Sequence, residues 1–220
     1  MYARRSTSGA LSLTSTARPI LYLALGDSYT IGTGASHESR NFPTLLAASV
    51  REASGREVEV VNPAVNGFTT IDLIAKELGY ITDLKPDLVS VLIGVNDLVQ
   101  GRGTQQYSES LVEIYDAIAA TQLPAGRVAA ISIPNWSVVP AARDFGDPAR
   151  LRGLTERFNA VARQEAETRR FTWVDLTEVS TRAMGSTGWI AADELHPGDA
   201  QYAAWAEEIW PHVRDAWSSL

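Results

Sequence analysis

From Ile20 onward, short apolar runs alternate with longer segments whose apolar residues recur at helical spacing. Each apolar run is too short to form a helix by itself, but its length suits a strand that is buried on both faces. Such an alternation is typical of repeated strand–helix–strand units, which fold into a parallel sheet covered by helices. We therefore expect an α/β fold in which the sheet is the middle of three layers.

Five strands and five helices are expected. The expected strands are Ile20–Leu25, Val58–Val61, Leu88–Ile93, Val128–Ile133 and Phe171–Leu176. The expected helices are Phe42–Ala53, Thr70–Leu78, Ser108–Ala120, Ala149–Arg169 and Asp199–Trp217. These elements predict a three-layer α/β/α sandwich around a five-stranded, mostly parallel sheet.

Length and composition indicate one domain. The chain has 220 residues, 45% of them hydrophobic and 20% charged, which is typical of a single globular unit. Residues 1–19 are polar and lack the apolar run of about 7–15 residues that a signal peptide needs. We expect a flexible polar tail over 1–19, one domain over 20–220 and a cytoplasmic location, with an atypical export signal as the alternative.

Charge and cysteine content exclude several classes of function. The net charge of −7 gives no basic surface for nucleic acid, and no apolar stretch approaches the roughly 18 residues that span a membrane. The chain has no cysteine, which excludes disulfides, thiolate nucleophiles and cysteine-bound zinc. A small-molecule substrate is the expected partner, and the oligomeric state is not indicated.

Two long connections also follow strands, at 134–148 and 177–197. Connections of this length are uncommon unless they are functional or disordered. Ligands of open parallel sheets bind outside the carboxyl ends of the strands, so segments that follow strands are candidates for the site. The segments 134–148 and 177–192 are expected to set the pocket size, and the sequence does not determine their conformations.

The first apolar run ends abruptly in Gly26-Asp27-Ser28. Glycine permits a tight turn, which places Ser28 at the carboxyl end of the strand as a candidate nucleophile. The same tripeptide is common in turns and at helix N-termini, so it is weak evidence alone. It is not the Gly-x-Ser-x-Gly turn of the α/β-hydrolases, because Thr30 stands where that motif has glycine.

A catalytic serine needs a base, and His196 is the best placed of three histidines. Asp193 precedes it by three residues, so its carboxylate can accept a hydrogen bond from Nδ1 and leave Nε2 for the serine proton. The alternative is that Asp193 caps a turn and His196 is a surface residue. No further cluster of ligands completes a metal site around this pair.

The other two histidines are weaker candidates. His37 follows the serine in a glycine-rich loop and could line the pocket, but no well-aimed carboxylate orients it. His212 lies late in the last expected helix, where the helix dipole is explanation enough.

Acyl transfer also needs hydrogen-bond donors for the oxyanion, and two are expected at the same edge of the sheet. Gly67 follows the second strand and allows a backbone N–H to approach a ligand. Asn96 follows the third strand and offers its side-chain amide. Either residue could instead belong to an ordinary turn or helix cap.

Together, the motifs resemble those of the SGNH hydrolases, also called the GDSL family. The matching residues occur in the family's order and span roughly Ile20 to Trp217: Gly26-Asp27-Ser28, Gly67, Gly94-x-Asn96-Asp97 and Asp193-x-x-His196. The resemblance implies a flavodoxin-like SGNH-hydrolase fold and a site without cofactor or metal. Ser28 would be the nucleophile and His196 the base, with Asp193 as its partner.

By the same resemblance, the oxyanion hole would consist of the Ser28 and Gly67 N–H groups and the Asn96 amide, while Asp27 and Asp97 would be structural. The expected activity is that of a serine esterase acting on short-chain acyl, acetylated sugar or lysophospholipid esters. The alternatives are an acyltransferase to an alcohol or sugar, and a non-catalytic ligand-binding module.

Overall fold

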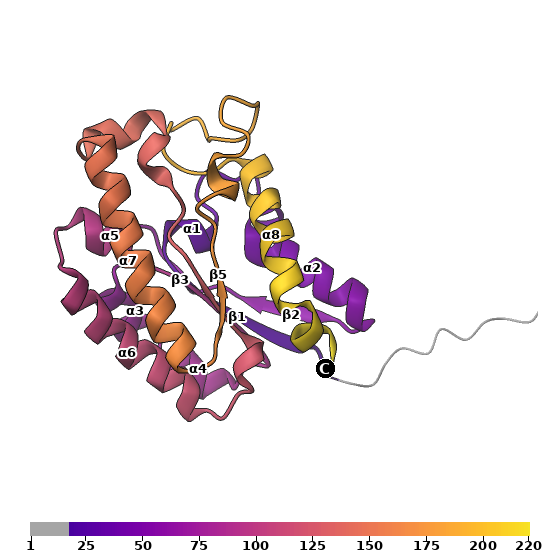
Figure 1. Ribbon diagram of the computed structural model, residues 1–220. Helices are drawn as coiled ribbons and strands as arrows, with labels where there is room; N and C mark the ends of the chain where they lie inside the picture. The colour runs from indigo at the N-terminus through magenta and orange to yellow at the C-terminus, as the bar shows by residue number, and fades with distance from the viewer. Residues whose placement is uncertain (1–17) are drawn as a thin grey trace, which may run out of the picture.

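A parallel sheet with helices on both faces makes up residues 18–220, the part of the chain that this computed structural model describes (Figure 1). The strands are β1 (Ile20–Gly26), β2 (Val58–Val61), β3 (Leu88–Leu92), β4 (Val128–Ile131) and β5 (Thr172–Val174). Their order in the sheet is β2-β1-β3-β4-β5, and every neighbouring pair is parallel. This is the flavodoxin-like order. The predicted fold class is confirmed, with a sheet that is wholly rather than mostly parallel.

Helices form the two outer layers. On one face α2 (Phe42–Ser54) packs along α8 (Asp199–Ser218), and on the other α6 (Thr104–Ala120) packs between α3 (Thr70–Lys76) and α7 (Pro148–Thr168) (Figure 1). Three shorter helices are α1 (Ser28–Ile31), α4 (Gly79–Leu84) and α5 (Val95–Val99). Among residues 18–220, no helix is both long and apolar enough to cross a bilayer.

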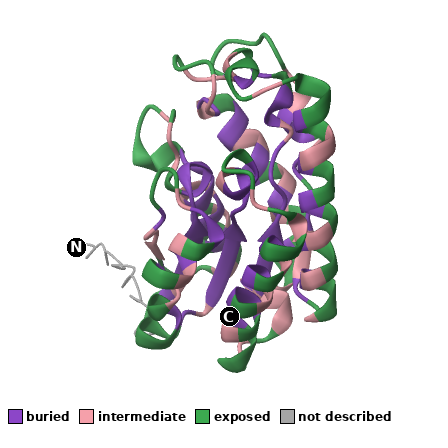
Figure 2. Ribbon diagram, turned by 90° about the vertical axis from the view of Figure 1, so that its left-hand side faces the viewer, coloured by how far each residue is buried: buried purple, intermediate pink, exposed green. Residues whose placement is uncertain are grey.

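The sheet is buried between these layers (Figure 2). Every residue of β3 is buried, as is nearly every residue of β1, which explains why these strands are continuously apolar in sequence. Trp205 and Trp217 of α8 fill one side of the core, and Tyr107 stacks on Phe158 at 4.6 Å between ring centroids on the other. Each large apolar side chain buried in this way contributes about 1.5–3 kcal/mol of transfer free energy.

The ends of several elements differ from the prediction. Helix α6 begins at Thr104 rather than at Ser108, because the Gln106 side chain accepts a hydrogen bond from the Gly103 N–H and caps a polar first turn. Apolar spacing cannot reveal such a turn. Strand β5 is shorter than predicted. Helices α1, α4 and α5 were not predicted, because each has only four to six residues and is too short to show apolar residues at helical spacing.

The described chain begins at an ion pair. The Arg18 guanidinium contacts both carboxylate oxygens of Asp87 at 2.7 Å, and Asp87 also accepts the Leu21 N–H at 2.9 Å. These contacts tie the start of β1 to the segment before β3. Residues 1–17 of the predicted tail lie outside the described residues, and the domain boundaries stay a prediction.

Candidate active site

The predicted site residues lie on four connections at the carboxyl edge of the sheet. Ser28 follows β1, Gly67 follows β2, Asn96 follows β3, and the Asp193–His196 segment follows β5. Because all five strands are parallel, these connections meet at one edge. The contacts described below join the four connections to one another.

The turn that carries Ser28 depends on Gly26. Gly26 has φ +156°, and a Cβ atom there would lie 2.2 Å from Thr30 Oγ1 and 2.3 Å from the Leu92 carbonyl oxygen. Only glycine fits this position. Asp27 then caps α1 by accepting the Tyr29 N–H at 3.0 Å, which makes Ser28 the first residue of the helix. The first-turn N–H of Ser28 donates to no acceptor in the described chain and is available to a ligand.

The Asp193–His196 pair has the geometry of a base and its orienting carboxylate. The Nδ1 atom of His196 lies 2.6 Å from Asp193 Oδ2, while Asp193 Oδ1 accepts the N–H groups of Leu195 and His196 at 3.0 and 2.9 Å. Partial burial of Asp193 raises its pKa, but the hydrogen bonds from the His196 ring and the two N–H groups outweigh that effect and lower the pKa. Asp193 is therefore a carboxylate that holds the Nδ1 proton and leaves Nε2 open.

A small hairpin presents this pair. Ile190 and Pro197 form an antiparallel bridge, and the Ala191 N–H donates to the His196 carbonyl at 2.8 Å. Glu194 adopts a left-handed conformation at the tip, with φ 60°. The fold thus places two residues from one turn at the sheet edge in a fixed orientation.

Aromatic packing brings His196 beside the serine turn. The His196 ring lies 6.2 Å from the Tyr29 ring, centroid to centroid and edge to face, and Tyr29 directly follows Ser28. Tyr29 in turn packs on Trp205 of α8. Between residues 18 and 220, no hydrogen bond joins Ser28 to His196. Such catalytic hydrogen bonds are often long without substrate and tighten when it binds.

Gly67 and Asn96 supply further donors. Gly67 has φ +82°, lies at the surface and has an N–H with no acceptor among residues 18–220. The Asn96 amide donates to the Phe68 carbonyl at 2.9 Å. Its second hydrogen bond, to Asp27 Oδ2, is long, at 3.4 Å. One proton of Asn96 is therefore weakly held. Three N–H donors can thus serve an oxyanion at this edge.

Two asparagines tie the Gly67 loop to the serine turn, and sequence reasoning missed both. Asn62 donates to the Thr30 carbonyl at 2.8 Å, and Asn66 accepts a hydrogen bond from the Thr33 hydroxyl. Both lie in the segment after β2 that ends at Gly67. The sequence carried no signal for their partners, which lie more than thirty residues away.

Arg102 was also missed, and it links two of the connections. Its Nη1 atom donates to Asp97 at 2.7 Å and to the Thr70 hydroxyl oxygen at 2.9 Å. Asp97 is fully buried and accepts the Thr70 N–H and hydroxyl at 2.9 and 2.6 Å. Asp97 therefore has the structural role implied by the resemblance, holding α5 against the start of α3.

The structure keeps the other histidines out of this arrangement. His37 caps a short 3₁₀ turn, with Nδ1 accepting the Ser39 N–H at 3.1 Å, and its ring is exposed. No carboxylate of residues 18–220 forms a hydrogen bond with its ring. His212 lies exposed in α8.

A small crevice lies beside the sequence neighbours of Ser28 and His196. It has a volume of about 10 Å³, and its lining includes Tyr29, Leu195 and Pro197 together with Trp136. Tyr29 and Trp136 are therefore at this crevice, while Ile31 is exposed on α1.

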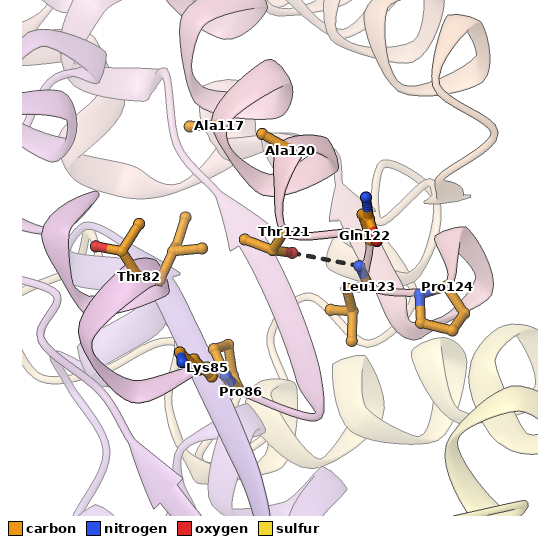
Figure 3. A pocket seen from close by; sticks show the side chains of 10 residues that line it. Thr82, Lys85, Pro86, Ala117, Ala120, Thr121, Gln122, Leu123 and Pro124 are labelled. Atoms are coloured by element: carbon orange, nitrogen blue, oxygen red, sulfur yellow. Dashed lines mark hydrogen bonds between the residues drawn. The ribbon is translucent and has the colours of Figure 1, made fainter.

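A cavity of about 510 Å³ lies at the opposite edge of the sheet (Figure 3). Its lining comes from α4, α6 and the segments that precede β3 and β4: Ile81, Thr82, Lys85, Pro86, Ala117, Ala120, Thr121, Gln122, Leu123 and Pro124. It contains no pairing of a nucleophile with a base. The candidate site is therefore the edge of the sheet that carries Ser28 rather than this cavity.

Comparison with known proteins agrees with the geometry. The model of the GDSL-like Lipase/Acylhydrolase family matches residues 24–204. Esterase TesA of Pseudomonas aeruginosa is 25% identical over 94% of this chain and 96% of its own, and a lipase of Streptomyces rimosus is 28% identical over 80% and 75%. The crystal structure of a lipase/acylhydrolase from Enterococcus faecalis superposes with a TM-score of 0.70 at 23% identity, covering 90% of this chain and 95% of that one.

Proposed function

The chain belongs to the GDSL-like lipase/acylhydrolase family and is a carboxylic ester hydrolase, and we propose that it cleaves esters of short acyl groups with Ser28 as nucleophile. One observation carries the assignment of Ser28. The Asp193–His196 pair, with 2.6 Å between Oδ2 and Nδ1, lies beside the turn that carries Ser28. The Ser28 N–H donates to no acceptor in the described chain. The named relatives are esterases and lipases, which favours hydrolysis over acyl transfer.

In the first half of the proposed cycle, Ser28 Oγ attacks the ester carbonyl carbon and His196 Nε2 takes the hydroxyl proton. Asp193 stabilises the imidazolium through Nδ1. Negative charge moves to the carbonyl oxygen, which in this proposal accepts hydrogen bonds from the N–H groups of Ser28 and Gly67 and from the Asn96 amide.

In the second half, the tetrahedral intermediate collapses and the bond to the alcohol oxygen breaks. His196 returns the proton to that oxygen, the alcohol leaves, and the acyl group stays on Ser28. Water then attacks the acyl-enzyme with His196 again as base, releasing the acid and restoring the serine.

Covalent labelling tests the nucleophile directly. A fluorophosphonate probe is expected to react with one serine, because its phosphoryl oxygen uses the same three donors as the oxyanion. Peptide mass spectrometry should locate the adduct on Ser28, and heat-denatured protein is the control. An adduct on another serine, or no adduct on active protein, would overturn the assignment.

The small crevice beside the serine turn favours a short acyl group. This crevice, lined by residues that include Tyr29, Trp136, Leu195 and Pro197, has a volume of about 10 Å³ and is no larger than a single water requires, so it offers no room for a long chain. Ile31 and Val65, on the connections that carry Ser28 and Gly67, are exposed.

We expect kcat/KM for p-nitrophenyl decanoate to be no higher than for the acetate or butyrate, since an added methylene gains about 1–3 kcal/mol only where a fitted pocket buries it. A series of p-nitrophenyl esters of increasing length, measured below the micelle concentration, checks this. A kcat/KM that rises with acyl-chain length would contradict the short-acyl proposal, but it would not bear on the assignment of Ser28 as nucleophile.

Asn96→Ala is expected to lower kcat by about a hundred-fold to a thousand-fold with little change in KM, because the lost donor serves the transition state more than the bound ester. Steady-state kinetics with p-nitrophenyl acetate measures this. Gln122→Ala, in the cavity at the opposite edge, is the matched control and should match wild type. A kcat within about threefold of wild type for Asn96→Ala would remove Asn96 from the oxyanion hole.

A further inference from the structure

The proposed mechanism leaves one carboxyl group behind the serine turn unexplained. Glu77, at the C-terminal end of α3, is fully buried. Its Oε2 atom accepts the Gly26 N–H at 2.9 Å, while Oε1 has no hydrogen-bond partner within residues 18–220. A buried polar atom without a partner calls for an explanation.

The groups around Glu77 do not neutralise a charge there. Asp27, also fully buried, is the titratable group that acts on it. Beyond Asp27 lie Tyr107 of α6 and Asp97, and the cation Arg102 is paired with Asp97. In the described part of the chain, no arginine, lysine or histidine forms an ion pair with Glu77.

A buried carboxylate with one hydrogen bond and no cation is costly, so the group remains protonated instead. Burial raises the pKa of Glu77 to about 8. The charge of Asp27 raises this pKa further, and the hydrogen bond from the Gly26 N–H lowers it. Burial likewise raises the pKa of Asp27 to about 7, with the charge of Asp97 adding to it and the Tyr29 N–H opposing it. At neutral pH the two carboxyl groups therefore need not both be charged.

The position of Glu77 connects this chemistry to the serine. Gly26, whose N–H it accepts, is two residues before Ser28 and has a backbone conformation that only glycine adopts here. Asp27 joins the cap of α1 to the Asn96 amide. A second negative charge at Glu77 would repel Asp27 and disturb both the serine turn and one oxyanion donor.

We propose that Glu77 is a positioning residue that holds the serine turn as an uncharged carboxylic acid, and that loss of its proton weakens catalysis at alkaline pH. This inference rests on the proposed function. Glutamine keeps an oxygen acceptor for Gly26 and cannot ionise, so Glu77→Gln separates the charge from the hydrogen bond.

The first test is the pH profile of kcat/KM for p-nitrophenyl acetate, corrected for spontaneous hydrolysis. Between about pH 7 and pH 9.5, wild type should lose about tenfold, whereas Glu77→Gln should lose less than about threefold relative to its own value at pH 7. Glu59→Gln, an exposed glutamate on β2, is the matched control and should follow wild type. Superimposable profiles for wild type and Glu77→Gln would overturn the proposal.

Glu77→Leu tests the hydrogen bond. It leaves the Gly26 N–H buried without an acceptor, so we expect kcat to fall by about tenfold or more while KM changes little, as for other small displacements of a nucleophile. A wild-type kcat in folded Glu77→Leu would contradict the positioning role. If this variant does not fold, the glutamine comparison decides alone.

Thermal unfolding gives a readout that needs no substrate. Between about pH 4.5 and pH 8 the unfolded chain releases the Glu77 proton while the folded protein keeps it, so this group makes wild type less stable as pH rises. The Tm of Glu77→Gln minus that of wild type should therefore increase from pH 5 to pH 8. A difference in Tm that stays constant between pH 5 and pH 8 would contradict an uncharged Glu77 in the folded protein. Wild type inactive on every ester would instead contradict the proposed function, and the positioning role with it.

Discussion

Ser28→Ala is expected to reduce kcat for p-nitrophenyl acetate by about a million-fold, which is the size of effect seen when a serine nucleophile acts as a unit with its base. The hydroxyl makes no hydrogen bond to any residue between 18 and 220, so its removal should cost the fold little. Steady-state kinetics with the highest practical enzyme concentration measures the loss, and the Tm should stay near that of wild type.

The matched control for this variant is Ser219→Ala. Ser219 is exposed at the C-terminal end of α8, so its loss should change neither kcat nor Tm. Activity of Ser28→Ala near the wild-type value would place the nucleophile elsewhere. A residual rate of about a thousand-fold to ten-thousand-fold over water would agree with the assignment, because the oxyanion donors remain.

His196→Ala is expected to cost about as much as the loss of the serine, roughly a million-fold, because Ser28 then has no base. Asp193→Ala should lower kcat less, by about ten-thousand-fold. The histidine stays, but it loses the carboxylate oxygen that lies 2.6 Å from its Nδ1 atom and keeps the proton there. The same ester assay measures both variants. Combining Ser28→Ala with His196→Ala should be no worse than either change alone, because the two groups act in one step.

His37→Ala is the control that separates the two candidate bases. Its ring caps an exposed 3₁₀ turn, so we expect activity close to wild type and at most a small loss of stability. Loss of activity in His37→Ala with retention in His196→Ala would reverse the assignment of the base.

The strands were the most predictable part of the fold. β1 and β3 are central and buried on both faces, so nearly all of their residues are apolar, and this is a local signal. The short helices α1 and α5 were not predictable in this way. Each is one turn held by tertiary contacts, such as the hydrogen bond from the Thr70 hydroxyl to Asp97 of α5 at 2.6 Å, rather than by its own apolar spacing.

In the candidate site, too, some features follow from local sequence and others depend on tertiary contacts. Ser28, Gly67, Asn96, Asp193 and His196 could be named because each follows a strand, and parallel strands bring their carboxyl ends together. Their chemical roles stay predictions until the variants are measured. The cytoplasmic location also stays a prediction. Asp193 and His196 are also close in sequence, so their pairing was readable from spacing alone.

The sequence by itself determined the α/β class, the parallel sheet and which residues meet at its edge, because apolar periodicity and polar breaks after strands are properties of neighbouring residues. Only the tertiary structure showed that Glu77 accepts the Gly26 N–H, that Arg102 joins Asp97 to Thr70, and that the crevice beside Tyr29 and Leu195 has a volume of only about 10 Å³. The bond from Gly26 to Glu77 crosses 51 residues of sequence. Buried polar contacts between distant segments depend on how whole layers pack, and a local pattern does not record that packing.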